Sequence, residues 1–325
     1  MFTFAGKLHI NNFSCIMANV IKIKKGLDIN LKGKASDVLL NGGKSESYAI
    51  VPDYYNGILP KVVAKVGEKV KAGSVLMIDK NRPEIKFVSP VSGEVTAVNR
   101  GEKRKVLSIV VKPDAQIEYE EFGKKNVASL QGAEVKEVLL NAGMWPFIKQ
   151  RPYDIVAAPL DTPRDIFVSA FYSAPLAPNF DFIVKGQEAD FQTGLNALAK
   201  LTNGKVYVGV RSGSVVSGMK GVEIVEVEGP HPAANVGVQI NHIKPVNKGE
   251  VVWTVNPADV IVIGRLFNKG VADFSRMVAI TGSETTERGY VKTISGCTIK
   301  SLVNGKVLGQ EHIRIISGNV LTGTK

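Results

Sequence analysis

The sequence has few cysteines and no long apolar run, and both shortages exclude classes of protein. Only Cys15 and Cys297 are cysteines, so the 325 residues can form neither a disulfide framework nor an iron–sulfur centre with several cysteine ligands. No window approaches the roughly 18 uninterrupted apolar residues of a membrane-spanning helix. The best candidate, residues 260–264, is bounded by Asp259 and Arg265. Any association with a membrane is therefore expected through partners or through the surface.

Aromatic residues are scarce where positive charge is greatest. The formal net charge is +11, and residues 61–112 hold 12 Lys and Arg against 5 Asp and Glu, with Phe87 as their one aromatic residue. Nucleic acid is disfavoured as a partner, because no platform for base stacking accompanies the charge. An acidic partner, an anionic membrane surface and a merely solvated lysine-rich surface remain as alternatives.

Glycine and proline, by contrast, are frequent, with 32 and 15 residues, and they predict many turns and short strands. Between Lys61 and Val111, short apolar stretches alternate with glycine or proline turns in two halves of similar pattern. We interpret this region as a flattened β-sandwich. The expected strands are residues 60–66, 75–78, 85–88, 94–98 and 107–111.

After a polar linker, the pattern changes to alternating helices and strands. Apolar residues at helical spacing predict helices over residues 130–142, which Gly143 ends, and over residues 188–201. This alternation predicts a mostly parallel sheet covered by helices, a degenerate Rossmann-like α/β domain. A last stretch, from residue 277, is expected to hold strands around a turn at Thr293–Gly296. The strands expected in the α/β domain are residues 166–171, 182–184, 206–210 and 222–227.

The segment from Gly143 to Phe147 occupies the place of a glycine-rich phosphate loop in two similar flavoproteins. These are the C subunit of the Rnf electron-transport complex and the flavoprotein subunit of respiratory complex I. Here Met144, Trp145 and Pro146 follow the glycine, and an anion cradle needs glycine for close approach and N–H groups that proline lacks. Losing two charge-assisted hydrogen bonds of about 1.5–3 kcal/mol each would weaken phosphate binding by roughly 10² to 10⁴. We therefore interpret the segment as a degenerate phosphate loop, whose rings either pack in the core or line an apolar pocket.

Two segments of the expected sandwich, residues 66–73 and 89–95, resemble the biotinyl/lipoyl domain family. In that family a lysine at the tip of an exposed hairpin carries the prosthetic group, and Lys80 and Lys86 lie in the corresponding hairpin. That hairpin is longer here, and neither lysine has the flanking pattern of a modified residue. A barrel without a prosthetic group is therefore favoured over a carrier.

Histidine offers one candidate for site chemistry. His231 lies between two prolines, where it either fixes a loop or donates to a quinone carbonyl. A sharper hypothesis brings Trp145, Phe147 and His231 into one quinone pocket, with aromatic faces around the ring. His242 is eleven residues further on, which matches no standard zinc spacing, so no metal site is predicted. No catalytic constellation can be placed.

Several separated segments, in this order and spacing, resemble the A subunits of Na+-translocating NADH:quinone reductases. The resemblance covers residues 17–303. The segments are residues 23–28, 87–93 with 99–101, 143–145 with 151–152, 202–208, 229–233, 251–253 with 259–260, 264–267 and 291–296.

The resemblance implies a peripheral subunit on the cytoplasmic side of the bacterial inner membrane. The complex oxidises NADH, reduces a quinone (ubiquinone is the expected kind) and moves Na+. Its flavins and iron–sulfur centre belong to other subunits. This chain would dock on the membrane subunits, contact quinone and bind no redox cofactor itself. The alternative is a flavin- and NADH-binding oxidoreductase subunit, like the flavoprotein relatives.

The expected organisation has six parts. Family members usually continue beyond the region matched here, so the sequence is expected to be truncated at its C-terminal side, within a β-grasp soluble-ligand-binding domain. The parts are residues 1–16, an over-extended start; 17–50, an N-terminal segment; 51–113, a biotinyl/lipoyl-like barrel; 114–250, the Rossmann-like domain; 251–276, a connecting segment; and 277–325, the truncated β-grasp domain.

Overall fold

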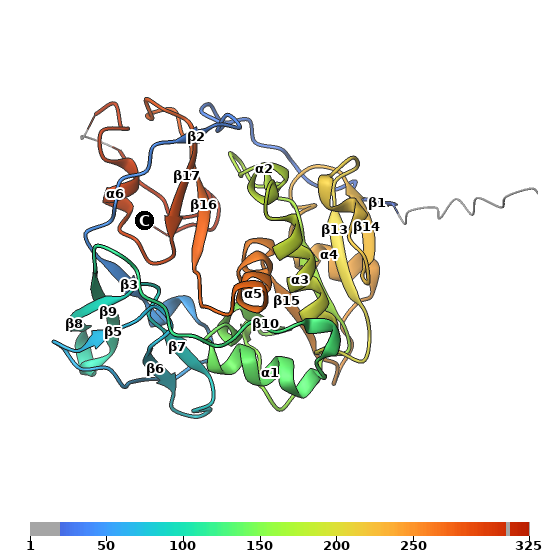
Figure 1. Cartoon of the computed structure of the whole chain (residues 1–325). Helices are drawn as coiled ribbons and strands as arrows, with labels where there is room; N and C mark the ends of the chain where they lie inside the picture. Colours follow the sequence, from blue (N-terminus) through green and yellow to red (C-terminus); the bar gives the residue numbers. More distant parts are fainter. Residues whose placement is uncertain (1–19, 310–312, 325) are drawn as a thin grey trace, which may run out of the picture.

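The computed structural model describes residues 20–309 and 313–324, which fold into three packed parts (Figure 1). These are a β-sandwich, a central seven-stranded sheet with helices on both faces, and a small three-stranded sheet. The expectation about residues 1–16 lies outside the described residues.

The β-sandwich confirms the interpretation of the glycine-rich region. A four-stranded sheet, in the order β3-β9-β8-β5, faces a three-stranded sheet, β4-β6-β7. Leu76, Phe87, Val95 and Ile109 are almost fully buried in its core. The strands are β3 (Tyr48–Ile50), β4 (Pro60–Val62), β5 (Lys69–Val70), β6 (Val75–Asp79), β7 (Lys86–Val88), β8 (Gly93–Arg100) and β9 (Val106–Pro113).

The hairpin between β6 and β7 is docked on the central domain. Arg82 donates from Nε to the buried carboxylate of Asp79 at 2.8 Å, from Nη1 to the Val156 carbonyl at 3.1 Å and from Nη2 to the Gly57 carbonyl at 3.0 Å. Lys86 donates to the side chain of Asn141 at 2.7 Å, whereas Lys80 is exposed. The hairpin that carries a prosthetic group in lipoyl domains therefore holds two domains together here.

The central sheet has the order β1-β14-β13-β12-β15-β10-β11. The first five strands are parallel to their neighbours, and β10 and β11 are antiparallel. The strands are β1 (Val20–Lys22), β10 (Ile148–Arg151), β11 (Ile155–Val156), β12 (Ile166–Ser169), β13 (Val206–Val210), β14 (Glu223–Glu228) and β15 (Val252–Val255).

Helices cover this sheet on both faces (Figure 1). α3 and α5 pack against each other on one face, while α4 packs against β12 on the other. The apolar rows predicted on the two helices are confirmed: α1 ends before Gly143, and α3 buries Phe191, Leu195 and Leu198. The helices are α1 (Gly132–Asn141), α2 (Phe180–Val184), α3 (Glu188–Ala199), α4 (Val236–Ile243) and α5 (Pro257–Lys269).

Three expectations are corrected here. Residues 182–184, expected as a strand, belong to helix α2, because Asn179 caps this helix and its apolar side is buried. Residues 251–276, expected as a connecting segment, supply strand β15 and helix α5 to the central domain. Of the turn expected at Thr293–Gly296, the first two residues belong to β17 and only Ser295 and Gly296 form a turn, whereas residues 281–288 join β16 to β17.

The N-terminal segment contacts all three parts. Its strands join the central sheet, the small sheet and the sandwich in turn, through β1, β2 and β3. The small sheet has the order β16-β17-β2 and carries α6; its β-grasp assignment stays a prediction. Its elements are β2 (Leu39–Leu40), β16 (Ser275–Ile280), β17 (Gly289–Ile294) and α6 (Ile299–Val303). In the described ranges, no helix has the length and apolar character needed to span a membrane.

Candidate functional site

A cleft of about 900 Å³ opens where the three parts meet. Strands β12 and β15 are adjacent in the sheet, but the chain proceeds from β12 to β13 on one side and reaches β15 only later, on the other. The connections diverge at this point, and in open α/β sheets such a point creates a crevice outside the carboxyl ends of the strands. Ser169 at the end of β12 and Thr254 in β15 both line the cleft. The topology of the sheet thus accounts for the position of this cleft.

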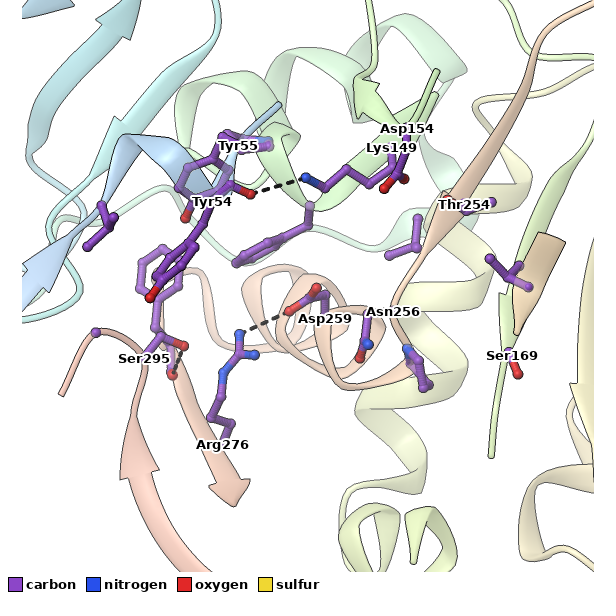
Figure 2. A pocket seen from close by; sticks show the side chains of 18 of the residues that line it. Tyr54, Tyr55, Lys149, Asp154, Ser169, Thr254, Asn256, Asp259, Arg276 and Ser295 are labelled. Atoms are coloured by element: carbon purple, nitrogen blue, oxygen red, sulfur yellow. Dashed lines mark hydrogen bonds and ion pairs between the residues drawn. The ribbon is translucent and has the colours of Figure 1, made fainter. Parts of the chain in front are cut away.

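Aromatic side chains from all three parts line one portion of the cleft, called here the aromatic portion (Figure 2). Tyr55 and Phe87 of the sandwich meet edge to face at 4.8 Å between ring centroids. Phe147 of the central domain meets Phe274, which precedes β16, at 6.1 Å. These faces provide an apolar surface on which a flat ring can pack.

Charged groups lie among these rings. Arg276 donates from Nη2 to Oδ1 of Asp259 at 2.9 Å (Figure 2). Burial raises the pKa of the Asp259 carboxyl, although the Arg276 guanidinium opposes the shift. Burial likewise lowers the pKa of Lys149, whose Nζ lies 3.5 Å from the Tyr54 carbonyl oxygen. Burial, reinforced by the Asp259 charge, raises the pKa of Tyr55 to about 12, so its hydroxyl stays protonated at neutral pH. The cleft therefore offers N–H and O–H donors beside aromatic faces.

The beginning of α4 lines one end of the cleft, called here the α4 end. Gln239 of α4 donates to Ser169 Oγ at 2.9 Å and to the Ala233 carbonyl at 3.1 Å, which fixes α4 against β12. The first residues of α4, from Asn235 to Val238, line this end together with Thr254.

The predicted degenerate phosphate loop follows the C-terminus of α1. The amide of Gly143 donates to the Leu140 carbonyl at 3.3 Å, and that of Met144 to the Leu139 carbonyl at 2.9 Å. Pro146 has no N–H, and the segment continues as a 3-10 turn, η4 (Trp145–Phe147). A helix C-terminus is the negative end of the helix dipole, so both bonding and charge disfavour an anion here.

The structure does not bring Trp145, Phe147 and His231 into one pocket. Phe147, like Gly143 and Pro146, lines the cleft. Trp145 and Met144 are fully buried in the core. The Trp145 ring lies edge to face with Trp253, and its Nε1–H donates to the Ala157 carbonyl at 2.8 Å.

His231 lies in a loop outside the cleft lining. Its Nδ1 is 3.1 Å from Ser173 Oγ, and its backbone N–H donates to Asp28 at 2.8 Å. The histidine thus fixes the loop against the N-terminal segment. Of the three residues, Phe147 alone is placed to contact a cleft ligand, and its role stays a prediction.

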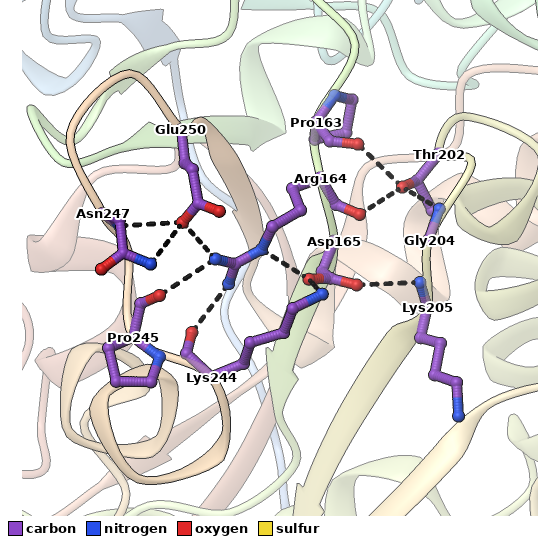
Figure 3. Close-up of polar contacts among 10 residues, drawn as sticks. All are labelled: Pro163, Arg164, Asp165, Thr202, Gly204, Lys205, Lys244, Pro245, Asn247 and Glu250. Carbon is purple, nitrogen blue, oxygen red and sulfur yellow. Dashed lines mark hydrogen bonds and ion pairs between the residues drawn. The ribbon is translucent and has the colours of Figure 1, made fainter.

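A polar network lies at the amino ends of the strands, opposite to the ends that form the cleft (Figure 3). Asp165, almost fully buried, accepts hydrogen bonds at 2.8 Å from both Arg164 and Lys244 and one at 3.1 Å from the Lys205 amide. Arg164 also pairs with Glu250. Burial would raise the pKa of Asp165, but the hydrogen bonds from Lys244, Lys205 and Arg164 outweigh it and lower that pKa. This network stabilises the domain and lies far from the cleft along the strands.

Sequence reasoning missed most of the cleft. Tyr55, Lys149, Thr254, Asp259 and Arg276 come from separate parts of the chain and carry no motif. One signal was available: Asn256-Pro257 after an apolar run is a typical N-cap and first helical residue, and it would have placed β15 and α5. Among the described residues, no three His, Cys, Asp or Glu side chains gather as a metal site.

Comparison with known proteins decides the family. The chain matches models for the NqrA N-terminal barrel-sandwich hybrid domain over residues 21–114, the NqrA second alpha/beta domain over residues 130–272 and the NQRA C-terminal domain over residues 277–325. It is 37% identical over 94% of its length to the A subunit of the Na(+)-translocating NADH-quinone reductase of Photorhabdus laumondii, covering 69% of that protein. The corresponding proteins of Hahella chejuensis and Neisseria meningitidis are 38% and 36% identical, with the same coverage.

The chain belongs to the NqrA family, the A subunits of Na(+)-translocating NADH-quinone reductases. This confirms the family predicted from its separated segments, and the barrel-sandwich assignment agrees with the two facing sheets described above. A NAD+-reducing [NiFe]-hydrogenase in its air-oxidized state is a distant match, with a TM-score of 0.32 and 12% identity over 46% of this chain and 34% of that one. Such a low score supports no inference. The NqrA relatives are named as part of an oxidoreductase complex.

Proposed function

We propose that this NqrA chain is a peripheral component on the cytoplasmic side of the bacterial inner membrane. It docks on the other subunits of the Na+-translocating NADH-quinone reductase and holds a quinone head group in the three-part cleft. In this proposal it binds no redox cofactor of its own, and the flavins and iron–sulfur centre belong to other subunits. We infer in addition that the central domain is a Rossmann-like fold that has lost its phosphate loop, and that the small sheet begins a β-grasp domain.

The cleft is the observation that carries the quinone proposal. A quinone head group is a flat, neutral ring with two carbonyl acceptors. The Phe147, Tyr55 and Phe87 rings supply faces for packing, and Lys149 supplies a donor at the same surface. A volume of about 900 Å³ lies within the usual range of small-molecule sites.

Lys149 can also keep a hydrogen bond to a quinone oxygen while the quinone is reduced. Two electrons and two protons convert the two carbonyl groups to hydroxyls, so a donor at one oxygen must hold a hydrogen bond while charge develops there. Burial makes the Lys149 ammonium more acidic than usual by lowering its pKa, which favours sharing of its proton with that oxygen. The charges of Asp154 and Asp259 oppose this shift.

The bonding of residues 143–147 supports the absence of a tightly held flavin at this place. The amides of Gly143 and Met144 are already bonded to carbonyls of α1, and the Phe147 amide is bonded to the Met144 carbonyl. Gly143 instead allows the central domain to pack closely on the sandwich, since a Cβ there would lie 2.6 Å from the Val88 side chain.

The test compares Lys149→Met with Lys149→Arg in the assembled complex, using affinity for a quinone analogue. The methionine variant keeps the length and loses the donor, so we expect affinity to fall about tenfold or more, while arginine keeps most of it. Unchanged affinity in Lys149→Met would contradict the proposal. For the flavoprotein alternative, the purified chain is examined for flavin absorbance, and a stoichiometric flavin band would overturn the claim that it has no redox cofactor.

A further inference from the structure

The N-terminus of α4 points to a second binding site at the α4 end of the cleft. Asn235 precedes the helix but makes no side-chain hydrogen bond to it. Its backbone carbonyl accepts from Val238 and Gln239, whereas the amides of Val236 and Gly237 meet no acceptor among residues 20–309 and 313–324. Both residues line the cleft, and the space around Gly237 is open, since a Cβ there would meet nothing within 4 Å.

Thr254 provides an independent observation at the same place. It is 5% exposed and lines the cleft, and across the described residues its hydroxyl has no hydrogen-bond partner. Side chains alternate along a strand, so Thr254 and Val252 point to the same face of β15. Val236 packs against the buried cluster that contains Val252. The unpartnered hydroxyl and the unpartnered amides therefore face the same end of the cleft.

The neighbouring helix α5 offers no such site, although it also begins at the cleft. Pro257 has no N–H, the Ala258 amide is bonded to the Asn256 side chain, and the Asp259 amide is bonded to the Asn256 carbonyl. Asp259 adds a negative charge to this first turn, whereas the first turn of α4 contains no acidic residue.

We propose that the α4 end of the cleft binds a phosphate group through the Val236 and Gly237 amides and the Thr254 hydroxyl. Two converging amides and the positive end of a helix dipole favour an oxyanion, and the hydroxyl donates a further hydrogen bond. The phosphate is either free or part of an organic ester, whose ring would extend toward the aromatic portion of the cleft. The two sites adjoin, because Thr254 is paired with Lys149 across β15 and β10. The phosphate proposal does not depend on quinone binding, which is argued from Lys149 and the aromatic portion.

The structure provides matched variants for the test. Val236 is the first helical residue and Asn235 before it is extended, so proline is compatible with this position and removes the amide N–H. Val236→Ala truncates the same side chain and keeps the N–H. Thr254→Val removes the hydroxyl at nearly constant volume, and Thr254→Ser keeps it.

Binding of inorganic phosphate and of adenosine monophosphate to the whole chain is measured by calorimetry. We expect saturable binding, weakened about tenfold or more by Val236→Pro and several-fold by Thr254→Val, with both controls close to the unsubstituted chain. Tighter binding of the monophosphate would identify an ester as the ligand, and equal binding would identify free phosphate. Absence of saturable binding of both probes, or unchanged affinity in Val236→Pro and Thr254→Val, would overturn the proposal. Thr254→Val serves as the readout if Val236→Pro does not fold.

Discussion

Gly143 lies so close to Val88 of strand β7 that a Cβ on the glycine would be 2.6 Å from Cγ1 of the valine. The contact joins the central domain to the sandwich beside the cleft, because both residues line it. Gly143 also has a φ of +66°, a conformation that other residues adopt only with strain. The glycine is therefore required for domain packing.

Gly143→Ala is expected to destabilise the chain by about 2–4 kcal/mol, since strain from positive φ adds to a clash with Val88. Gly213→Ala is the control. Gly213 has a φ of +76°, but a Cβ there would meet nothing within 4 Å. A loss of about 1 kcal/mol in unfolding free energy is therefore expected from strain alone. Denaturant unfolding measures both. Equal losses would show that the Val88 contact is unimportant.

Arg82→Lys is expected to loosen the docking of the sandwich on the central domain. Lysine cannot reproduce the geometry with which the guanidinium reaches Asp79, Val156 and Gly57. We expect a loss of about 1–3 kcal/mol in unfolding free energy. Lys80→Ala, at an exposed position of the same hairpin, should change stability little, and a similar effect of both variants would contradict this docking role.

Asp165 should make stability depend on pH in acid. Its pKa is lowered in the folded chain, so its stabilising contribution is present above the unfolded pKa of about 3.9 and is lost as pH falls through the folded value. Asp165→Asn should lower the unfolding free energy by about 2–4 kcal/mol at pH 7. As the pH falls below about 4, the variant should lose less stability than the unsubstituted chain. Unfolding free energies measured across this range test it. Glu223→Gln, which breaks the exposed pair with Lys205, should change the unfolding free energy little.

The hairpin tip at Lys103 and Arg104 contains backbone strain that can be relieved. The two residues have φ of 52° and 61°, values typical of the two central residues of a type I′ turn, where Asn-Gly is preferred. The double substitution Lys103→Asn with Arg104→Gly should raise the unfolding free energy by about 0.5–2 kcal/mol. Glutamine at both positions removes the same charges and keeps the strain. An equal increase in unfolding free energy in that variant would show that the effect comes from charge and not from backbone strain.

Elements with a long, regular pattern could be predicted from the sequence. The rows on α1 and α3 and the strand β13 were placed nearly residue by residue. Residues 182–184 were assigned to the wrong type of element, because a short apolar run fits a strand or a buried helix equally well. The arrangement in space decided between them.

The candidate site could be predicted only in part. Phe147 was placed correctly at a cavity, but nothing local shows that Trp145 stacks with Trp253 or that His231 bonds to Asp28 and Ser173. The cleft depends on contacts between segments far apart in the chain, as in the pair between Asp259 of α5 and Arg276 of β16. Such pairings follow from domain packing, which no local pattern encodes.

The most direct test of the quinone proposal locates the quinone itself. A photoreactive quinone analogue is bound to the assembled complex, activated by light and mapped by mass spectrometry of peptides. We predict labelling of residues 143–151 and 49–55, which both contain cleft-lining residues, and competition by unlabelled quinone. Labelling of this chain confined to other segments, or found only on other subunits, would contradict the claim that the three-part cleft holds the quinone.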